Sequence, residues 1–441
     1  MHVKVTIEID GRKAGEFEKE VSGRAAEMEE ACLSVGRRVG RIVLEQGLSE
    51  LAAGCRAPVC CEHRMESRGI RLITVSTMTG PVTLGRRRHR CRLCGHTVYA
   101  GDAEILCGPH RVTMPLAKRL CQLATTEHFT RLPQLLADQH GIEIGHEEIA
   151  EIVHEVGGHA DRMRRVEAAS FRSGPCAARS WPEPRVRPER IYVSCDGVMY
   201  CTNQREPDPQ HPGQMRMVWQ QMRVGCVSWQ DAQEKWHKQM IWGRETVEEF
   251  GAALFRLACQ CGYREAREKV FTCDGGDWCW TIHMLYFSQA TGILDWYHAS
   301  QHVWQAAHEL FAEQDPATAW ADQALALMRD EGGSGLFAWL QEQLTGRRGK
   351  ARGALQKLLT YVRTKQHLMD YPQYRARDWP IGSGMIESTG KQLVGGRLKG
   401  PGMHWTEAGA LAVTALRATD LNGGWHDYWK SLLLTKRTPT N

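Results

Sequence analysis

The chain has 441 residues, of which 42% are hydrophobic and 24% charged. This length allows roughly two to four domains, and the composition excludes a disordered or fibrous protein. No apolar run reaches the ~18 residues of a membrane helix, and the N-terminus lacks the apolar core of a signal peptide, so we expect a cytoplasmic protein. Its 16 cysteines are then expected to be thiols or metal ligands. The net charge of +5 alone indicates little about binding partners. The positions of charge clusters along the chain are more informative.

The first segment, 1–54, begins with a predicted strand from Val3 to Ile7, along which apolar and polar residues alternate. A helix is predicted from Arg24 to Ala53. Apolar residues recur along it with the spacing of a heptad seam, at Met28, Cys32, Val35, Val39 and Ile42. So short a seam favours packing against the helix's own domain over a contact between two copies of the chain.

The second segment, 55–112, is rich in cysteine and histidine. Two motifs, Cys60-x-x-His63 and Cys91-x-x-Cys94, flank two predicted strands. Each spacing lets two side chains reach one tetrahedral ion, which is typical of a zinc ribbon. We therefore predict a structural Zn²⁺ ion held by Cys60, His63, Cys91 and Cys94. Other residues compete for the first pair of ligands or share the spacing: Cys55, Cys61, Cys107 and His110.

The remaining segments predict a helical module followed by an α/β domain. Residues 113–172 contain three stretches with helical periodicity, which favours a helix-turn-helix-like DNA-binding module. A proline-rich linker is predicted at 173–190. Residues 191–298 show the strand and helix order of an RNase H-like fold, 299–378 a helical insertion, and 379–441 the rest of that domain with C-terminal helices. The predicted class is multidomain α+β.

Three acidic residues occupy informative places in the predicted α/β domain. Asp196 lies in its first strand, Asp274 directly follows its fourth, and Glu387 lies at the glycine-rich start of a helix. Hard carboxylate oxygens suit Mg²⁺ or Mn²⁺, and two such ions can support phosphodiester chemistry. Asp277 competes with Asp274, although it could instead cap a helix. Asp274 is preferred because it comes directly after the strand.

Several motifs in 191–418 resemble those of DDE transposases of the bacterial insertion-sequence ISKra type, which are distantly related to Mutator-like transposases. The motifs are VSCDGV, TCDGGDW, ILDWYHASQHVW and IGSGMIESTGKQLVGGRLKGPGMHW. The N-terminal half also resembles that family, in which the first cysteine pair is usually Cys-x-x-Cys, so His63 is a departure. The resemblance implies that Asp196, Asp274 and Glu387 form the DDE triad. It also implies a functional Asp-x-x-His signature at Asp295 and His298, which local sequence alone explains equally well as a helix start.

Basic residues cluster near these predicted sites, where contacts with DNA phosphates are the natural interpretation. The third helix of the predicted small module carries one such run, but its acidic residues leave a simple structural bundle as an equal alternative. The predicted DNA contacts are Arg86, Arg87, Arg88, Arg90, Arg162, Arg164, Arg165, Arg347, Arg348, Lys391, Arg397 and Lys399.

Together these features predict a nucleoid-associated DNA transposase that binds the terminal repeats of its element and cuts and joins DNA strands. The expected cofactors are Mg²⁺ or Mn²⁺ and structural Zn²⁺. The expected partners are double-stranded DNA, both element ends and target, and a second copy of the chain. Two alternatives stay open. One is an RNase H-like nuclease or resolvase that cuts without joining. The other is a transposase-derived, zinc-dependent DNA-binding regulator, which would have no need of the acidic triad.

Overall fold

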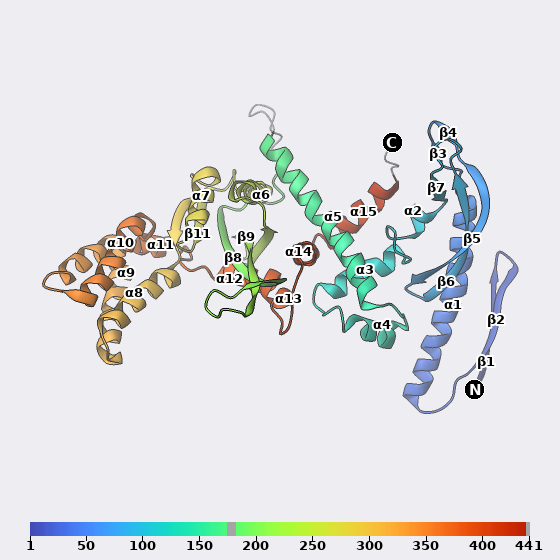
Figure 1. Cartoon of the computed structure of the whole chain (residues 1–441), viewed down its shortest axis with the longest axis horizontal. Helices are drawn as coiled ribbons and strands as arrows, with labels where there is room; N and C mark the ends of the chain where they lie inside the picture. The colour runs from blue at the N-terminus through green and yellow to red at the C-terminus, as the bar shows by residue number, and fades with distance from the viewer. Residues whose placement is uncertain (174–181, 438–441) are drawn as a thin grey trace. The chain divides into compact units, whose positions relative to one another are not determined.

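The computed structural model describes residues 1–173 and 182–437, which divide into two compact units. The first unit contains Met1–Ala160 and Ala415–Asn441, and the second contains Asp161–Thr414. Both hold helices and strands, so the predicted multidomain α+β class is confirmed (Figure 1). The boundary falls inside the long helix α5 (His146–Ser173). In the predicted linker 173–190, residues 174–181 lie outside the described residues.

A hairpin and a long helix open the first unit. Strands β1 (His2–Ile9) and β2 (Arg12–Glu20) pair antiparallel around a turn with positive φ angles, as two-residue hairpin turns require. Helix α1 (Ala25–Gly54) packs against β2 and the later strand β6. Its Ile42 lies close to Gly15 of β2, where an added Cβ would be 3.0 Å from Ile42 Cδ1. The C-terminal part of the heptad seam therefore packs within its own unit.

A three-stranded antiparallel sheet in the order β5-β6-β7 forms the next layer of the first unit. Its strands are β5 (Glu66–Thr77), β6 (Gly80–Arg90) and β7 (Thr97–Tyr99), and a short ladder of β3 (Val59–Cys60) with β4 (His63–Arg64) precedes them. The predicted strand pair between the two cysteine motifs is therefore present. Its core, shared with Ala52 of α1, includes buried Ile73, Val75, Val82 and Leu84.

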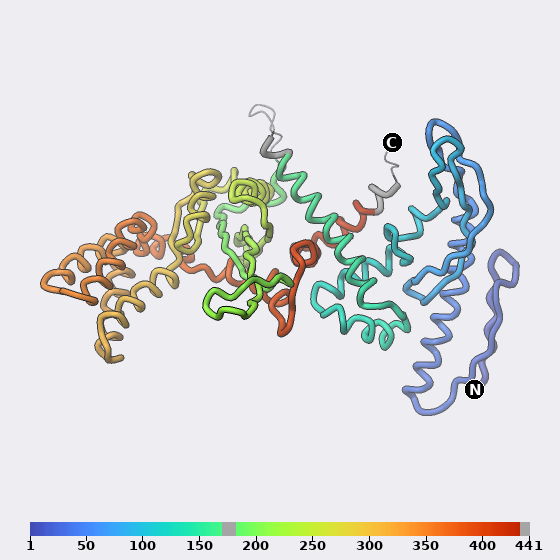
Figure 2. Tube along the Cα trace, in the orientation of Figure 1, coloured from blue at the N-terminus to red at the C-terminus, as the bar shows by residue number. Residues whose placement is uncertain are grey.

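Helices complete the first unit. They are α2 (Asp102–Ile105), α3 (Met114–Ala124), α4 (Leu132–His140), α5 and, from the C-terminus, α15 (Trp425–Arg437). The three helices predicted in 113–172 correspond to α3, α4 and α5. Tyr428 donates a hydrogen bond to the Val156 carbonyl at 2.6 Å, and the Arg417 guanidinium donates to the Thr125 carbonyl. The C-terminal segment, red in Figure 2, is thereby fastened to α3 and α5.

The second unit is built on a mixed five-stranded sheet in the order β10-β9-β8-β11-β12. Its strands are β8 (Arg190–Pro207), β9 (Met215–Gln230), β10 (Trp236–Gly243), β11 (Glu268–Cys273) and β12 (Thr291–Leu294). The first three are antiparallel neighbours, whereas β11 runs parallel to both β8 and β12. Helices α6 (Val247–Gln260) and α7 (Asp277–Tyr286) link the later strands in the predicted order.

Two apolar cores lie against this sheet. One joins the strands to α6 and α7 and includes Val193, Phe250 and Phe271, all fully buried. The other joins Ile293 of β12 to the helices of the predicted insertion. These helices are α8 (Trp296–Leu310), α9 (Gln314–Gln343), α10 (Gly349–Lys365), a 3₁₀ helix (Gln366–Leu368) and α11 (Tyr371–Ala376). The insertion is therefore a packed part of the second unit.

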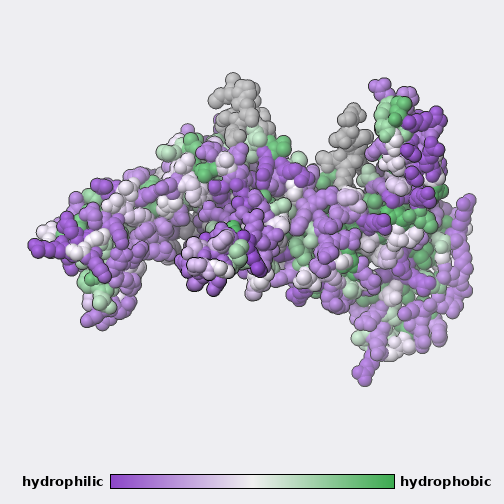
Figure 3. Space-filling model, in the orientation of Figure 1, coloured by the Kyte–Doolittle hydropathy of each residue, from purple (hydrophilic) through white to green (hydrophobic). Residues whose placement is uncertain are grey.

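After the insertion the chain returns to the sheet through a run of short helical segments. They are α12 (Gly384–Gly390), a π-helical segment (Lys391–Gly395), α13 (Gly396–Leu398) and α14 (Glu407–Leu421). Helix α12 packs against β8 and β9, and Gly390 permits this because an added Cβ would lie 2.8 Å from Val198. Hydrophilic residues predominate on the visible surface (Figure 3). Across the described residues, no helix is both long and apolar enough to cross a membrane.

Candidate active site and metal centre

The sheet register places Asp196 and Asp274 on neighbouring strands. Strands β8 and β11 are parallel, and their ladder ends with Ser194 opposite Thr272. Asp196 follows Ser194 by two residues within β8. Asp274 follows Thr272 by two residues and comes directly after the last residue of β11. Neighbouring strands are about 4.8 Å apart, and residues two apart in a strand point to the same face. The two carboxylates therefore lie side by side at the end of this ladder.

Helix α12 brings Glu387 to the same sheet, because the helix packs on β8 and β9. Ser383, just before the helix, donates its hydroxyl to Glu387 Oε1 at 3.3 Å. Lys391 Nζ lies 3.7 Å from Glu387 Oε2, and the Glu387 side chain is 50% exposed. Glu387 is therefore oriented by two neighbours while one side remains open to a ligand.

The carboxylates influence one another electrostatically. Burial is the largest cause that raises the pKa of Asp196, and the charges of Asp274, Glu387 and Asp295 raise it further. The Gly197 N–H, which donates to Asp196 Oδ1 at 2.6 Å, opposes this shift. Negative charges so close together repel when all are ionised, and a divalent cation would relieve that repulsion.

These carboxylates do not form a closely gathered metal cage. Among the described residues, one set of three or more potential ligand side chains has its atoms within 4.8 Å of one another, and it consists of cysteines. Asp196 Oδ1 is engaged by the Gly197 amide, and Asp274 Oδ1 accepts the Gly276 N–H at 3.0 Å. The donor chemistry nevertheless fits Mg²⁺ or Mn²⁺.

Asp277 fits the carboxylate cluster less well than Asp274. It is the first residue of α7, its side chain is 100% exposed, and it lies 3.6 Å from Lys365 Nζ. It is also not among the carboxylates that raise the pKa of Asp196. The geometry therefore favours Asp274 as the second acidic residue.

Asp295 and His298 lie at the N-terminus of α8. The buried Asp295 accepts the His298 N–H at 2.9 Å, which caps the helix, and its other oxygen accepts the Ser383 N–H at 2.7 Å. Because both oxygens are occupied, Asp295 fits a positioning role that ties α8 to the segment before Glu387. His298 lies against Gly275, where an added Cβ would be 2.8 Å from His298 Nε2. The imidazole therefore adjoins the turn that follows Asp274.

Two further side chains beside His298 are not among the residues predicted from the sequence. His302 lies one turn later on α8, and its Nε2 is 3.3 Å from His298 Nε2. Tyr361 comes from α10 of the insertion. The His-x-x-x-His spacing was a readable signal for His302, because it places both side chains on one helix face. No local pattern connects Tyr361 with a site so far away in the sequence.

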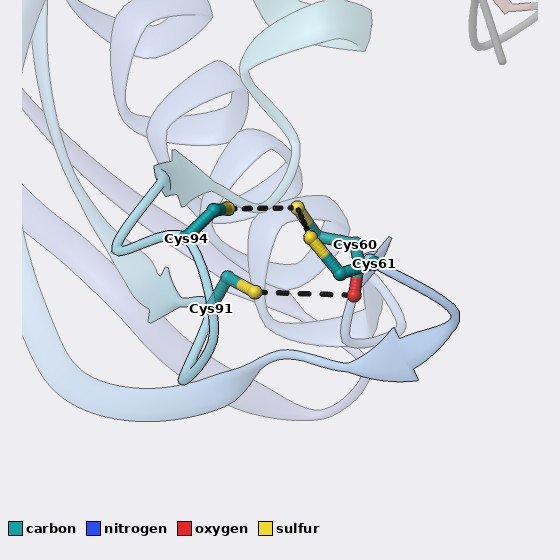
Figure 4. Close-up of side chains that lie close together, drawn as sticks. All are labelled: Cys60, Cys61, Cys91 and Cys94. Carbon is teal, nitrogen blue, oxygen red and sulfur yellow. Dashed lines mark hydrogen bonds between the residues drawn. The ribbon is translucent and has the colours of Figure 1, made fainter.

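Four cysteines from two turns meet in the first unit (Figure 4). The sulfur atoms of Cys60, Cys61, Cys91 and Cys94 all lie within 4.8 Å of one another. Cys60 Sγ is 3.5 Å from Cys94 Sγ and 3.9 Å from Cys61 Sγ. Tetrahedral zinc with Zn–S bonds of about 2.3 Å needs sulfur atoms about 3.8 Å apart. The cluster can therefore hold a metal such as zinc.

His63 does not join this cluster, contrary to the prediction, and Cys61 takes its place. Cys61 and Glu62 have φ angles of 49° and 64° in the turn between β3 and β4. This left-handed turn brings the Cys61 thiol beside that of Cys60. The His63 ring instead places Nδ1 2.8 Å from the Cys61 carbonyl oxygen.

The other candidate ligands lie elsewhere. The Cys55 thiol donates to the Leu51 carbonyl at 3.2 Å. His110 Nε2 lies 3.0 Å from Glu155 Oε2, and the His110 N–H donates to the Cys107 carbonyl, which closes a turn. The spacing of Cys107 and His110 is therefore explained by a turn.

Backbone amides favour a thiolate in the cysteine cluster. Hydrogen bonds from the N–H groups of Cys94 and Leu93 lower the pKa of Cys91 to about 6. Hydrogen bonding with Cys94 is the largest cause that raises the pKa of Cys60 to about 12. Metals bind thiolates, so loading of the cluster near neutral pH would release protons from the thiols that are still protonated.

Three of the predicted DNA contacts have side chains engaged inside the protein. Arg86 is ion-paired with Asp102 and lies 3.8 Å over the Tyr99 ring. Arg164 is 11% exposed and pairs with Glu245 at 2.5 Å. Arg397 is 1% exposed. These arginines stabilise the fold, contrary to the prediction that they contact phosphates.

The other predicted DNA contacts are more accessible. Arg88 is half-buried, and Arg165 lies at the surface although its Nε is 2.7 Å from Asp161. The exposed ones are Arg87, Arg90, Arg162, Arg347, Arg348, Lys391 and Lys399. Among the arginines of β6, Arg87 and Arg90 are therefore the most accessible to a phosphate.

Comparisons with known proteins do not assign this chain to a family. Neither the models of protein families nor the curated proteins give a match to this chain. The interpretation of the two sites therefore depends on their own geometry and chemistry.

Proposed function

We propose that this chain is a DDE transposase with an RNase H-like catalytic unit. The observation that carries the proposal is that Asp196 on β8 and Asp274 directly after β11 lie at one mixed sheet, against which the helix of Glu387 packs. Three antiparallel strands followed by two parallel ones, in the order β10-β9-β8-β11-β12, suit an RNase H-like fold. In this order β8 and β11 are neighbours, so carboxylates on both can serve one phosphodiester.

The proposed chemistry assigns distinct tasks to the site residues. Asp196, Asp274 and Glu387 would hold Mg²⁺ or Mn²⁺, which stabilises the charge of the attacking and leaving oxygens when bound. Asp295 holds the start of α8 against the segment before Glu387. Lys391, beside Glu387, offers positive charge to a phosphate. Water is the first nucleophile and a DNA 3′-hydroxyl the second, so the protein need not supply one.

The proposal extends to the first unit, which would bind the ends of the element. The four-cysteine cluster would hold Zn²⁺ and fix the short β3-β4 ladder against the turn of Cys91 and Cys94, as in a zinc ribbon. Exposed Arg87 and Arg90 on β6 would contact phosphates. A second copy of the chain on the DNA would allow both element ends to be handled together.

Cleavage of DNA that carries the chain's own flanking repeats tests the proposal. We expect Asp196→Ala, Asp274→Ala and Glu387→Ala each to reduce Mg²⁺-dependent cleavage to the level seen without metal, while affinity for the DNA is kept. Asp277→Ala is the matched control and should cleave like wild type, because its side chain points into solvent. Activity in Asp274→Ala with loss in Asp277→Ala would move the role to Asp277.

The same assay separates the alternative functions. A transposase must also yield products in which the freed 3′ end is joined to target DNA. Cleavage without joined products would identify a nuclease or resolvase. Specific binding of the repeats without any metal-dependent cleavage would instead identify a DNA-binding regulator.

A further inference from the structure

An imidazole pair and a tyrosine ring form a compact stack beside the carboxylate cluster. On α8 the Nε2 atoms of His298 and His302 are 3.3 Å apart. The Tyr361 ring, from α10, lies over His302 with ring centroids 3.9 Å apart and an interplanar angle of 30°. The His298 and His302 rings meet edge to face, at 79°. Tyr361, a residue of the helical insertion, thus packs against His302, which in turn contacts His298.

The imidazole pair restricts the protonation of both rings. A hydrogen bond between two Nε2 atoms needs one N–H donor and one lone pair, so the two neutral rings must be opposite tautomers. The tautomer of His298 is therefore tied to that of His302, and the short distance restricts the orientation of the His298 ring. Partners of this kind set the tautomer of functional histidines in other sites.

Tyr361 holds the pair by its ring and not by its hydroxyl. The Tyr361 hydroxyl is buried and makes no hydrogen bond to any described residue. The ring also approaches the turn after Asp274, because a Cβ added to Gly275 would lie 3.7 Å from Tyr361 Cε2. His302 is thereby confined between the Tyr361 ring and His298.

We propose that His302 and Tyr361 are positioning residues that hold the His298 imidazole, in one tautomer, against the turn of Asp274 and Gly275. In this arrangement the helical insertion supports the site directly. The effect on DNA cleavage rests on the proposed function, whereas the effect on the His298 ring does not. The two can therefore be tested separately.

The first experiment observes the ring without DNA. We would record the two-bond ¹H–¹⁵N spectrum of the full chain labelled with ¹⁵N-histidine, and assign His298 by comparison with His298→Gln. In wild type the His298 signals should show one tautomer, and in His302→Phe they should move to the averaged pattern of an unconstrained imidazole. His308→Phe is the matched control, because His308 is on the same helix and stacks on Trp304 instead. An unchanged His298 pattern in His302→Phe would overturn the proposal, whether or not the protein cuts DNA.

The second experiment measures cleavage at saturating DNA. Loss of a residue that orients a functional histidine costs about 10- to 100-fold in comparable sites, so His302→Phe and Tyr361→Leu should slow cleavage by about that factor with unchanged DNA affinity. His302→Gln, which keeps a donor and an acceptor, should recover part of the rate. Tyr361→Phe keeps the ring and should cleave faster than Tyr361→Leu. Equal losses in His302→Phe and His308→Phe would show a merely structural effect and refute the positioning role.

Discussion

The salt dependence of DNA binding should reveal how many arginines of β6 touch phosphates. Each phosphate that a protein neutralises contributes about 0.9 to the slope of log affinity against log salt on duplex DNA. Four free arginines would contribute about 3.6, but Arg86 is engaged by Asp102 and Tyr99. Replacing Arg87, Arg88 and Arg90 by Gln should therefore reduce the slope by about 2.7, or by about 1.8 if half-buried Arg88 makes no contact.

The assay is fluorescence anisotropy of labelled DNA between about 50 and 200 mM salt. Affinity should fall similarly for terminal and unrelated DNA, because phosphate contacts carry no sequence information. Arg86→Gln is the control and should leave the slope unchanged. A slope unaffected by the triple substitution, with metal content intact, would refute the assignment of β6 to DNA. A full unit lost in Arg86→Gln alone would instead show that Arg86 contacts a phosphate despite its ion pair with Asp102.

Two further predictions concern the cysteine cluster and a buried ion pair. Elemental analysis should find one zinc per chain, lost in the Cys91→Ser, Cys94→Ser double variant and kept in His63→Ala; zinc loss in His63→Ala would restore His63 as a ligand. Arg164→Met leaves Glu245 buried without its partner, so urea titration should show a loss of about 3–5 kcal/mol in the free energy of unfolding. Burial raises the pKa of Glu245, but Arg164 outweighs it and lowers that pKa below the usual 4.5. Wild type should therefore lose this stabilisation as pH falls below about 4.5, and equal pH profiles for both proteins would contradict the pairing.

Periodicity was sufficient to predict the elements that position the candidate site. Strands and helices with one buried face leave a pattern of two or 3.6 residues, which located the strands from β8 to β12 and the largely helical character of the insertion. The predicted strand order made the first and fourth strands neighbours, and the observed register, which ends with Ser194 opposite Thr272, brings Asp196 and Asp274 to the same end of the ladder. The placement of the acidic residues was therefore within reach of the sequence.

Contacts between distant residues left no such pattern. A basic run shows where positive charge lies, but not that Asp102 neutralises Arg86 or that Glu245 neutralises Arg164. The first cysteine motif failed for a different reason. From the sequence, either His63 or Cys61 could be the second ligand beside Cys60. Only the left-handed turn at Cys61, which the sequence does not reveal, decides between them.

The return of residues 415–437 to the first unit affects how the protein is made. A ribosome releases α3 and α5 long before Tyr428, which donates to the Val156 carbonyl of α5. The second unit is contiguous from Asp161 to Thr414, so it can fold while the first still lacks its last helices. A chain truncated before Ala415 would keep every candidate catalytic residue without a finished first unit. If that unit binds the element ends, complete translation becomes a condition for engaging them.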